Sequence, residues 1–189
     1  MKRIIVSLSI ISALLILPLS ADPCPEKNMI TKMVTDMDSF KAVSPLDYRV
    51  IRSAGAQLSR DGTKLTVSLS NMENIPVNKL VNDFVLPITK KDQFILDIEL
   101  RNEKKEIVAG TYSGSSGYGK PFWAFAEVKL HKGEKGVIVS LGIREGEVNI
   151  TKMTDKMVCG KFMLRSKAGS LPDSVLSGEF NVPVEKSAW

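Results

Sequence analysis

Apolar and polar residues alternate with a period of two along most of the chain after Tyr48. In residues 65–70, leucine and valine alternate with threonine and serine, and residues 94–101 repeat the pattern with charged residues at polar positions. Successive side chains of a β-strand point to opposite faces, so this period is typical of half-buried strands. The pattern predicts strands at residues 57–59, 65–70, 94–101, 107–111, 123–130, 137–143, 147–151, 157–164 and 175–182.

Turn residues separate these segments. Asp61 and Gly62 lie between the first two, and an Asp-Gly pair suits the positive φ angles of a tight hairpin. Many short strands separated by turns predict an all-β fold. We expect an antiparallel β-sandwich, with a closed, lipocalin-like β-barrel as the alternative.

Two segments near the C-terminus each combine a glycine with an aromatic residue. Gly160 and Phe162 alternate in the first, and Gly178 and Phe180 alternate in the second. The pattern is similar to the closing hairpin of exported bacterial β domains. The resemblance implies that the two segments are paired strands.

A different spacing occurs before Tyr48. Met29, Met33 and Met37 are four residues apart, which would place three thioethers on one face of a helix. We therefore expect an N-terminal tail with a short helix, residues 22–47, followed by a single β domain, residues 48–189.

The first 21 residues contain the three parts of a secretory signal peptide. Lys2 and Arg3 form the basic start, residues 4–17 form the apolar middle, and Ala21 is a small residue at the end. The apolar middle is shorter than the roughly 20 residues that cross a bilayer. We predict cleavage after Ala21 and a secreted or periplasmic protein without a transmembrane span. A retained membrane anchor is the alternative, because Leu19 is larger than the residue usual at that position.

The charge of the chain is only mildly basic. It has 26 lysine and arginine residues against 21 aspartate and glutamate residues, a formal net charge of +5. The densest basic patches, residues 90–91 and 104–105, adjoin acidic residues. Proteins that bind nucleic acid usually cluster their basic residues, so we expect no nucleic-acid partner.

The chain has two cysteines, Cys24 and Cys159. In an oxidising compartment, an even number of thiols most simply pairs. There is no Cys-x-x-Cys motif and only one histidine, which argues against a redox or metal-binding pair. The sequence therefore predicts a structural disulfide between the N-terminal tail and a late strand.

The methionines suggest a metal hypothesis. Thioether sulfur selects Cu(I), and Met29, Met33 and Met37 would combine with His131 or with the later Met153. Methionine also fills gaps in protein cores, and we favour that interpretation. We therefore expect no cofactor.

Residues 114–123 form the most unusual stretch, with glycines, serines, three aromatic residues and a lysine. Tyr118, Lys120, Phe122 and Trp123 are the candidates for contact with a ligand, because aromatic side chains on loops frequently contact ligands. The alternative is that Phe122 and Trp123 simply begin the next core strand.

No enzymatic motif stands out. A single histidine argues against a Ser-His-Asp triad and against a multi-histidine metal centre. We predict a monomeric, exported, non-catalytic protein that acts in binding or in the envelope, with a protein, a glycan or a small molecule as its partner. The alternative is a barrel that carries a small apolar ligand, and copper handling through methionines is a third hypothesis.

Overall fold

The computed structural model describes residues 23–35, 48–76, 88, 90, 93–114, 122–132, 137–143, 145–166 and 174–187. The predicted signal peptide, residues 1–21, lies outside this part of the chain. The described residues form a ten-stranded sheet. They contain no helix, and therefore none that is long and apolar enough to cross a membrane. The strands are β1 (Met29–Thr35), β2 (Ser53–Leu58), β3 (Lys64–Ser70), β4 (Phe94–Asn102), β5 (Gly110–Gly114), β6 (Phe122–Lys132), β7 (Val137–Ile143), β8 (Glu145–Met153), β9 (Met157–Arg165) and β10 (Ser174–Lys186).

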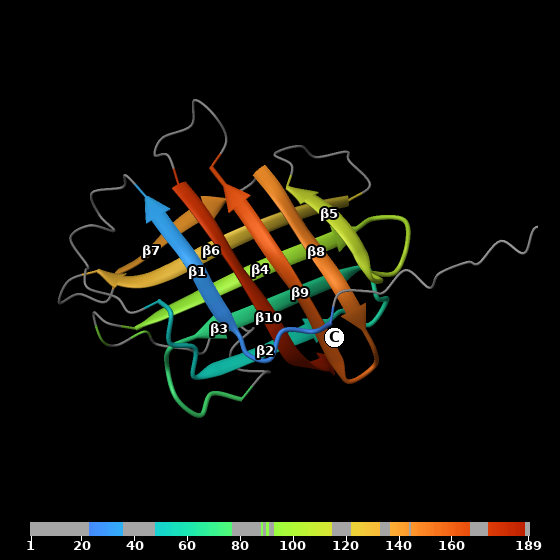
Figure 1. Ribbon diagram of the computed structural model, residues 1–189, viewed down its shortest axis with the longest axis horizontal. Coiled ribbons are helices and arrows are strands. Elements are labelled where there is room, and N and C mark those ends of the chain that lie inside the picture. The colour runs from blue at the N-terminus through green and yellow to red at the C-terminus, as the bar shows by residue number, and fades with distance from the viewer. Residues whose placement is uncertain are drawn as a thin grey trace, which may run out of the picture.

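The strands hydrogen-bond in the order β1-β10-β2-β3-β4-β6-β5-β8-β9, while β7 pairs with β6, and β9 also pairs with β10. The sheet curls into a half-barrel in which β1, β10, β9 and β8 form a front layer that crosses a rear layer of β2, β3, β4 and β6 (Figure 1). Most pairs are antiparallel, as predicted. The β10–β2 and β5–β6 pairs are parallel exceptions that connect the layers, so the sheet is mixed.

The strands predicted from the alternation between residues 57 and 182 are all present. The strand predicted at 107–111 begins later, at Gly110, because the preceding backbone bonds elsewhere. Ile107 N–H donates to the carbonyl of Gly62 (2.8 Å). Val108 N–H donates to the hydroxyl oxygen of Tyr112 and its carbonyl accepts from that hydroxyl, both at 2.9 Å.

The predicted Asp-Gly hairpin connects β2 to β3. Gly62 has a φ of 72°, which supplies the left-handed residue of the turn. Asp61 has a different role, because its Oδ1 accepts hydrogen bonds from Ser59 Oγ (2.7 Å), Thr63 N (3.1 Å) and Thr63 Oγ1 (2.9 Å). The Ser59 hydroxyl, followed by Thr63, holds the pKa of Asp61 below its ordinary value.

The predicted N-terminal helix is wrong. Met29–Thr35 is strand β1, which pairs antiparallel with β10. Side chains return to the same face every two residues in a strand and about every 3.6 residues in a helix. Residues four apart, such as Met29 and Met33, therefore share a face in either element. Hydrogen bonding to β10 favours the strand over the helix for this segment. Met37 lies outside the described residues.

A bulge in β1 separates the two methionines. The register shifts between Ile30 and Lys32, so that Met29 lies opposite Glu179 whereas Met33 lies opposite Leu176. Glu179 and Leu176 are three residues apart on β10, so they lie on opposite faces of the sheet. Each methionine shares the face of the residue that it pairs with. Met33 therefore faces the core with Leu176, and Met29 faces outward.

The hydrophobic core lies between the two layers. Among the described side chains, inward positions of β1–β6 and β8–β10 contribute to one cluster of buried residues. Two phenylalanines, Phe94 and Phe180, are the largest side chains that are fully buried. Burial of this apolar surface is the main driving force for a fold of this kind.

The predicted closing hairpin is present as the β9–β10 pair, and each phenylalanine lies opposite a glycine. Phe162 is opposite Gly178, and Phe180 is opposite Gly160. A Cβ atom at Gly160 would lie 2.2 Å from the carbonyl oxygen of Asn149 and 2.9 Å from Cζ of Phe180. A Cβ atom at Gly178 would lie 2.6 Å from Cζ of Phe162. Each ring therefore covers the glycine across from it, an arrangement that fixes strand register.

Strand β10 changes partners along one edge, from β1 at its start to β2 at its end. Val184 N–H donates on the β9 side, to the carbonyl of Lys156 (2.8 Å). Because N–H groups alternate in direction along a strand, positions 181 and 183 face the gap between β1 and β2. Pro183 has no N–H group to satisfy there. Asn181 N–H donates to Oδ1 of Asn28 (2.7 Å), so the gap leaves neither position with an unpaired donor.

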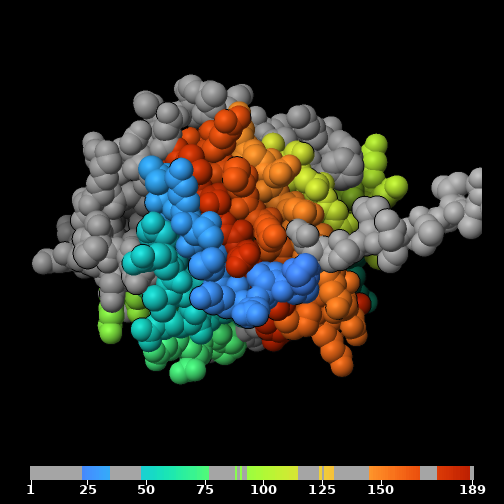
Figure 2. Space-filling view, in the orientation of Figure 1, coloured from blue at the N-terminus to red at the C-terminus, as the bar shows by residue number. Residues whose placement is uncertain are grey.

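The predicted disulfide between Cys24 and Cys159 is present, with Cα atoms 5.6 Å apart. Cys159 lies opposite Asn181 on the outer face of β9, yet it is only 1% exposed. The N-terminal segment, residues 23–28, crosses the front layer at this level (Figure 2). Asn181 Nδ2 donates to the carbonyl of Pro25 (3.0 Å), so the segment is held by hydrogen bonds as well as by the disulfide. A disulfide is compatible with the predicted export.

Replacing Gly160 with alanine is expected to lower the free energy of unfolding by about 2 kcal/mol, because the new methyl group must displace the backbone of Asn149. Urea denaturation measures the change. Met163→Leu, at a position of the same strand that is 66% exposed, is the control and should alter stability by less than about 0.5 kcal/mol. Unchanged stability of the Gly160 variant would show that the glycine is not required for this register.

The Asp61 carboxylate is expected to titrate below its ordinary pKa of 3.8. The ionised form is favoured by the fold, so its contribution to stability is present above the unfolded pKa and is lost as the pH falls through the lowered folded pKa. An NMR titration of the Asp61 carboxyl group measures this pKa directly. Ser59→Ala should raise it, and Ser113→Ala should not. An ordinary pKa for Asp61 in the wild-type protein would contradict the role of the turn.

Candidate functional site

The segment predicted to contact a ligand lies between β5 and β6. Tyr118 and Lys120 lie outside the described residues. Phe122 and Trp123 are the first residues of β6, and the register places Trp123 opposite Arg101 of β4. Their side chains are outside the described part of the structure.

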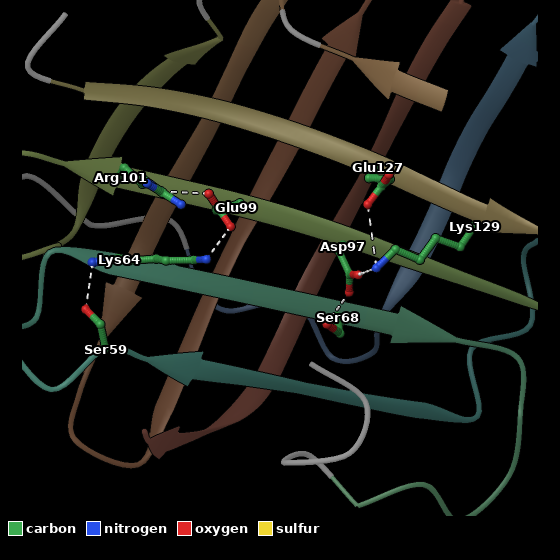
Figure 3. Close-up of polar contacts among 8 residues, drawn as sticks. All are labelled: Ser59, Lys64, Ser68, Asp97, Glu99, Arg101, Glu127 and Lys129. Atoms are coloured by element: carbon green, nitrogen blue, oxygen red, sulfur yellow. Dashed lines mark hydrogen bonds and ion pairs between the residues drawn. The ribbon is translucent and has the colours of Figure 1, made fainter. Parts of the chain in front are cut away.

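A row of charged and hydroxyl side chains crosses β3, β4 and β6 on the outer face of the rear layer (Figure 3). The alternate positions of the same strands supply leucine, valine, isoleucine and alanine to the core, so the strand period directs this row away from it. We call this set the charged row, and it comprises Lys64, Ser68, Asp97, Glu99, Arg101, Glu127 and Lys129.

One end of the charged row is a buried ion pair. Lys129 Nζ donates to Oδ2 of Asp97 at 2.8 Å, and each side chain is 11% exposed. Ser68 Oγ donates to the other carboxylate oxygen of Asp97. Glu127 Oε2 lies 3.5 Å from Lys129 Nζ. A buried charge must be paired and hydrogen-bonded to offset its loss of hydration, and these contacts meet that requirement.

A small apolar cluster lies beside the buried ion pair. It consists of Met72, Ile88 and Ile95, and Ile75 packs against it. Ile95 stands opposite Lys129 in the register, two residues before Asp97 on β4. The outer face of the rear layer is therefore partly covered, which explains how charged residues on it are buried.

The other end of the charged row is open to solvent. Glu99 forms ion pairs with two cations. Lys64 Nζ lies 2.5 Å from its Oε2, and Arg101 Nε donates to its Oε1 at 2.8 Å. The side chains of Lys64 and Arg101 are 39% and 46% exposed. Ion pairs at this exposure contribute little to stability. We call this group the Glu99 triad.

The two ends of the charged row differ in their described ion pairs. In the Glu99 triad, two cations, Lys64 and Arg101, contact one carboxylate. At the buried end, two carboxylates, those of Asp97 and Glu127, contact Lys129. The accessible end is therefore the one suited to an anionic group, which arginine binds through charge-assisted hydrogen bonds.

The Glu99 triad adjoins the start of β6. Arg101 lies opposite Trp123, and Glu99 lies opposite Phe125. The segment singled out for ligand contact thus leads directly into positions paired with the triad. The register thus pairs the backbone of Trp123 with Arg101 of the triad.

The methionines proposed for copper are not brought together by the register. Met33 lies opposite Leu176, whereas Met153 lies opposite Val158, which in turn lies opposite Val182. Six residues of β10 separate these two levels, roughly 20 Å at a rise of about 3.3 Å per residue. The convergence that a thioether site requires is absent for this pair.

Two further residues of the metal hypothesis lie outside the described part of the structure: Met37, and the side chain of His131 in β6. Among the side chains that the structure describes, no group of three or more histidine, cysteine, aspartate or glutamate residues is arranged to hold a metal ion.

The buried ion pair was not singled out by the sequence. The alternation places Asp97 on the polar face of its strand but contains no information about what covers that face. One signal was present, because the outward residues of β3 that follow Lys64 are Thr66, Ser68 and Ser70, all small and uncharged. All three are buried.

Comparison with known proteins gives no match. No protein-family model, curated protein or solved structure is similar to the chain.

Replacing Asp97 with asparagine is expected to lower the free energy of unfolding by about 3–5 kcal/mol, because Lys129 stays buried without its main counter-ion. Glu99→Gln is the matched control and should cost less than about 1 kcal/mol, since its partners are solvated. Chemical denaturation compares the two. Equal losses would contradict the difference in burial along the row.

Proposed function

We propose that the chain is an exported, non-catalytic β domain that binds a polar ligand on its outer surface, where the Glu99 triad meets the start of β6. The observation that carries the proposal is the pair of exposed cations in the triad, Lys64 and Arg101, the second of which lies opposite Trp123 in the register. The disulfide supports residence in an oxidising compartment. In this proposal the chain acts as a monomer.

The packing of the interior supports a surface site over an internal one. Inward side chains from both layers belong to one contiguous cluster, with Phe94 and Phe180 fully buried inside it. A carrier of a small apolar ligand needs a sizeable cavity lined by such side chains. The same residues fill space in the packed core, so we prefer the surface site to the carrier hypothesis.

For the fold, we propose a barrel-like sandwich with crossed layers. The crossing of the front and rear layers supports the sandwich description (Figure 1). The β9–β10 pairing, which joins the last strand of the order to the second, supports the barrel description. An orthogonal sandwich is similar to a barrel, because strands at its corners pair with both layers.

The ligand class that fits these residues best is an acidic glycan. A guanidinium group binds a carboxylate in a bidentate manner, and we assign Arg101 to this contact, with Lys120 as a second cation. Aromatic rings offer a large apolar face with a polar handle, which suits the face of a sugar ring, and we assign Tyr118 and Trp123 to it. Glu99 positions Arg101 through the 2.8 Å hydrogen bond.

A glycan array with matched neutral and carboxylate-bearing sugars tests the proposal. The wild-type protein should bind the acidic set, and Arg101→Gln should weaken that binding about tenfold or more, as expected for the loss of a charge-assisted hydrogen bond. Tyr118→Ala should weaken it as well.

Arg165→Gln is the control, because Arg165 is an exposed arginine paired with Glu145 on the front layer (3.4 Å). It should retain wild-type binding. Absence of acidic-glycan binding in the wild-type protein, or an equal loss in the Arg165 variant, would contradict the proposed site.

A further inference from the structure

The disulfide joins two sulfur atoms with different access to solvent. Cys24 belongs to the N-terminal segment, residues 23–28, and is partly exposed. Cys159 lies on β9 beneath that segment and is 1% exposed. Thiol–disulfide exchange requires a thiolate to reach the sulfur that it attacks. An external thiolate can therefore reach Cys24 more readily than Cys159.

The surroundings of Cys159 favour its departure as a thiolate. A bulge in β8 falls at Thr151, and the hydroxyl of Thr151 lies 3.3 Å from both Sγ and the carbonyl oxygen of Cys159. A disulfide sulfur carries no proton, so the hydroxyl is the donor, and its one proton is shared between these two acceptors. Lys152 is the residue of β8 opposite Cys159 in the register. A hydroxyl donor and a cationic residue at the paired position both favour negative charge on sulfur.

We propose that Cys24 is a site of mixed-disulfide formation and that Cys159 is the resolving cysteine. An external thiolate attacks Sγ of Cys24, the bond between the two cysteines breaks, and Cys159 leaves with the electron pair as a thiolate. Cys24 then carries the external thiol in a disulfide. In the reverse step, the Cys159 thiolate attacks Sγ of Cys24 and expels the external thiolate, so atoms and electrons balance without an oxidant.

Exchange at Cys24 loosens the N-terminal segment without unfolding the sheet. Two hydrogen bonds from Asn181, to Pro25 and Asn28, still hold residues 23–28 to β10. Strand β1 stays in place, because it pairs with β10 and buries Ile30 in the core. The opened form presents Cys159 and the outer face of β9 around it.

Glutathione provides the first test. The oxidised protein is incubated with reduced glutathione, quenched with an alkylating agent and mapped by peptide mass spectrometry. The glutathione adduct should be on Cys24 and the alkyl group on Cys159, in excess of the reverse pattern by about tenfold. A parallel arm with a reduced Cys-x-x-Cys oxidoreductase, its resolving cysteine replaced, distinguishes a protein thiol from a small one as the faster reagent.

Three outcomes overturn the proposal. One is an adduct mainly on Cys159, another is equal labelling of the two cysteines, and the third is no adduct in either arm under conditions in which the unfolded protein reacts. Hydrogen exchange of the adduct gives a further check. It should accelerate in residues 23–28 and not in β1, and acceleration throughout the sheet would contradict local opening.

Variants at Thr151 test the leaving-group contact. Thr151→Val should slow exchange about threefold or more, and Thr151→Ser, which keeps the hydroxyl, should restore the rate. Thr111→Val, on the outer face of β5, is the control and should react as the wild type does. Equal rates for the valine and serine variants would show that the hydroxyl has no part in the step.

Discussion

Strand β10 must pair with three other strands at once, and the rest of the structure depends on this constraint. Strand β9 follows one edge from Val175 to Pro183, while β1 and then β2 occupy the other. A slip of one residue would exchange every inward and outward position of β10, exposing Phe180 and burying its polar neighbours. Gly160 and Gly178 add a steric condition, because each must lie opposite a phenylalanine ring. The pairings of β10 therefore determine the strand register, the inward side chains of the core and the crossing of the two layers.

The same constraint explains the N-terminal segment. Between β1 and β2 the edge of β10 has no strand partner, and Pro183 and Asn181 occupy that gap. Asn181 binds the segment through its backbone and its side chain, and Cys159, directly opposite on β9, binds it covalently. The outer face of the front layer is therefore covered at this level, whereas further along β9 Met163 is 66% exposed. The rear layer differs, since on its outer face Asp97 and Lys129 are buried, whereas Lys64 and Arg101 of the Glu99 triad are exposed.

Local pattern was sufficient to predict the strands after Tyr48, the Asp61–Gly62 hairpin and the cysteine pair, because each depends on the strand period, on a turn residue or on redox compartment. It was not sufficient at Met29 and Met33, whose spacing fits a helix and a strand equally well; the choice is made by β10, more than 140 residues away in the register. Likewise, alternation places Asp97 on an outer face but cannot tell whether that face is covered. The candidate loop was found from composition, whereas its neighbour, the Glu99 triad, depends on the pairing of β4 with β6, which sequence alone does not supply.

Native-state hydrogen exchange of β10 tests the central role of this strand most directly. If its three pairings hold the fold together, the amides between Leu176 and Val184 that face β9 should exchange only through global unfolding, with the largest free energy of opening in the protein. Strands with fewer pairings, such as β7, should open at lower free energy. Exchange of the β10 amides by local opening, while β3 and β4 remain protected, would contradict this account.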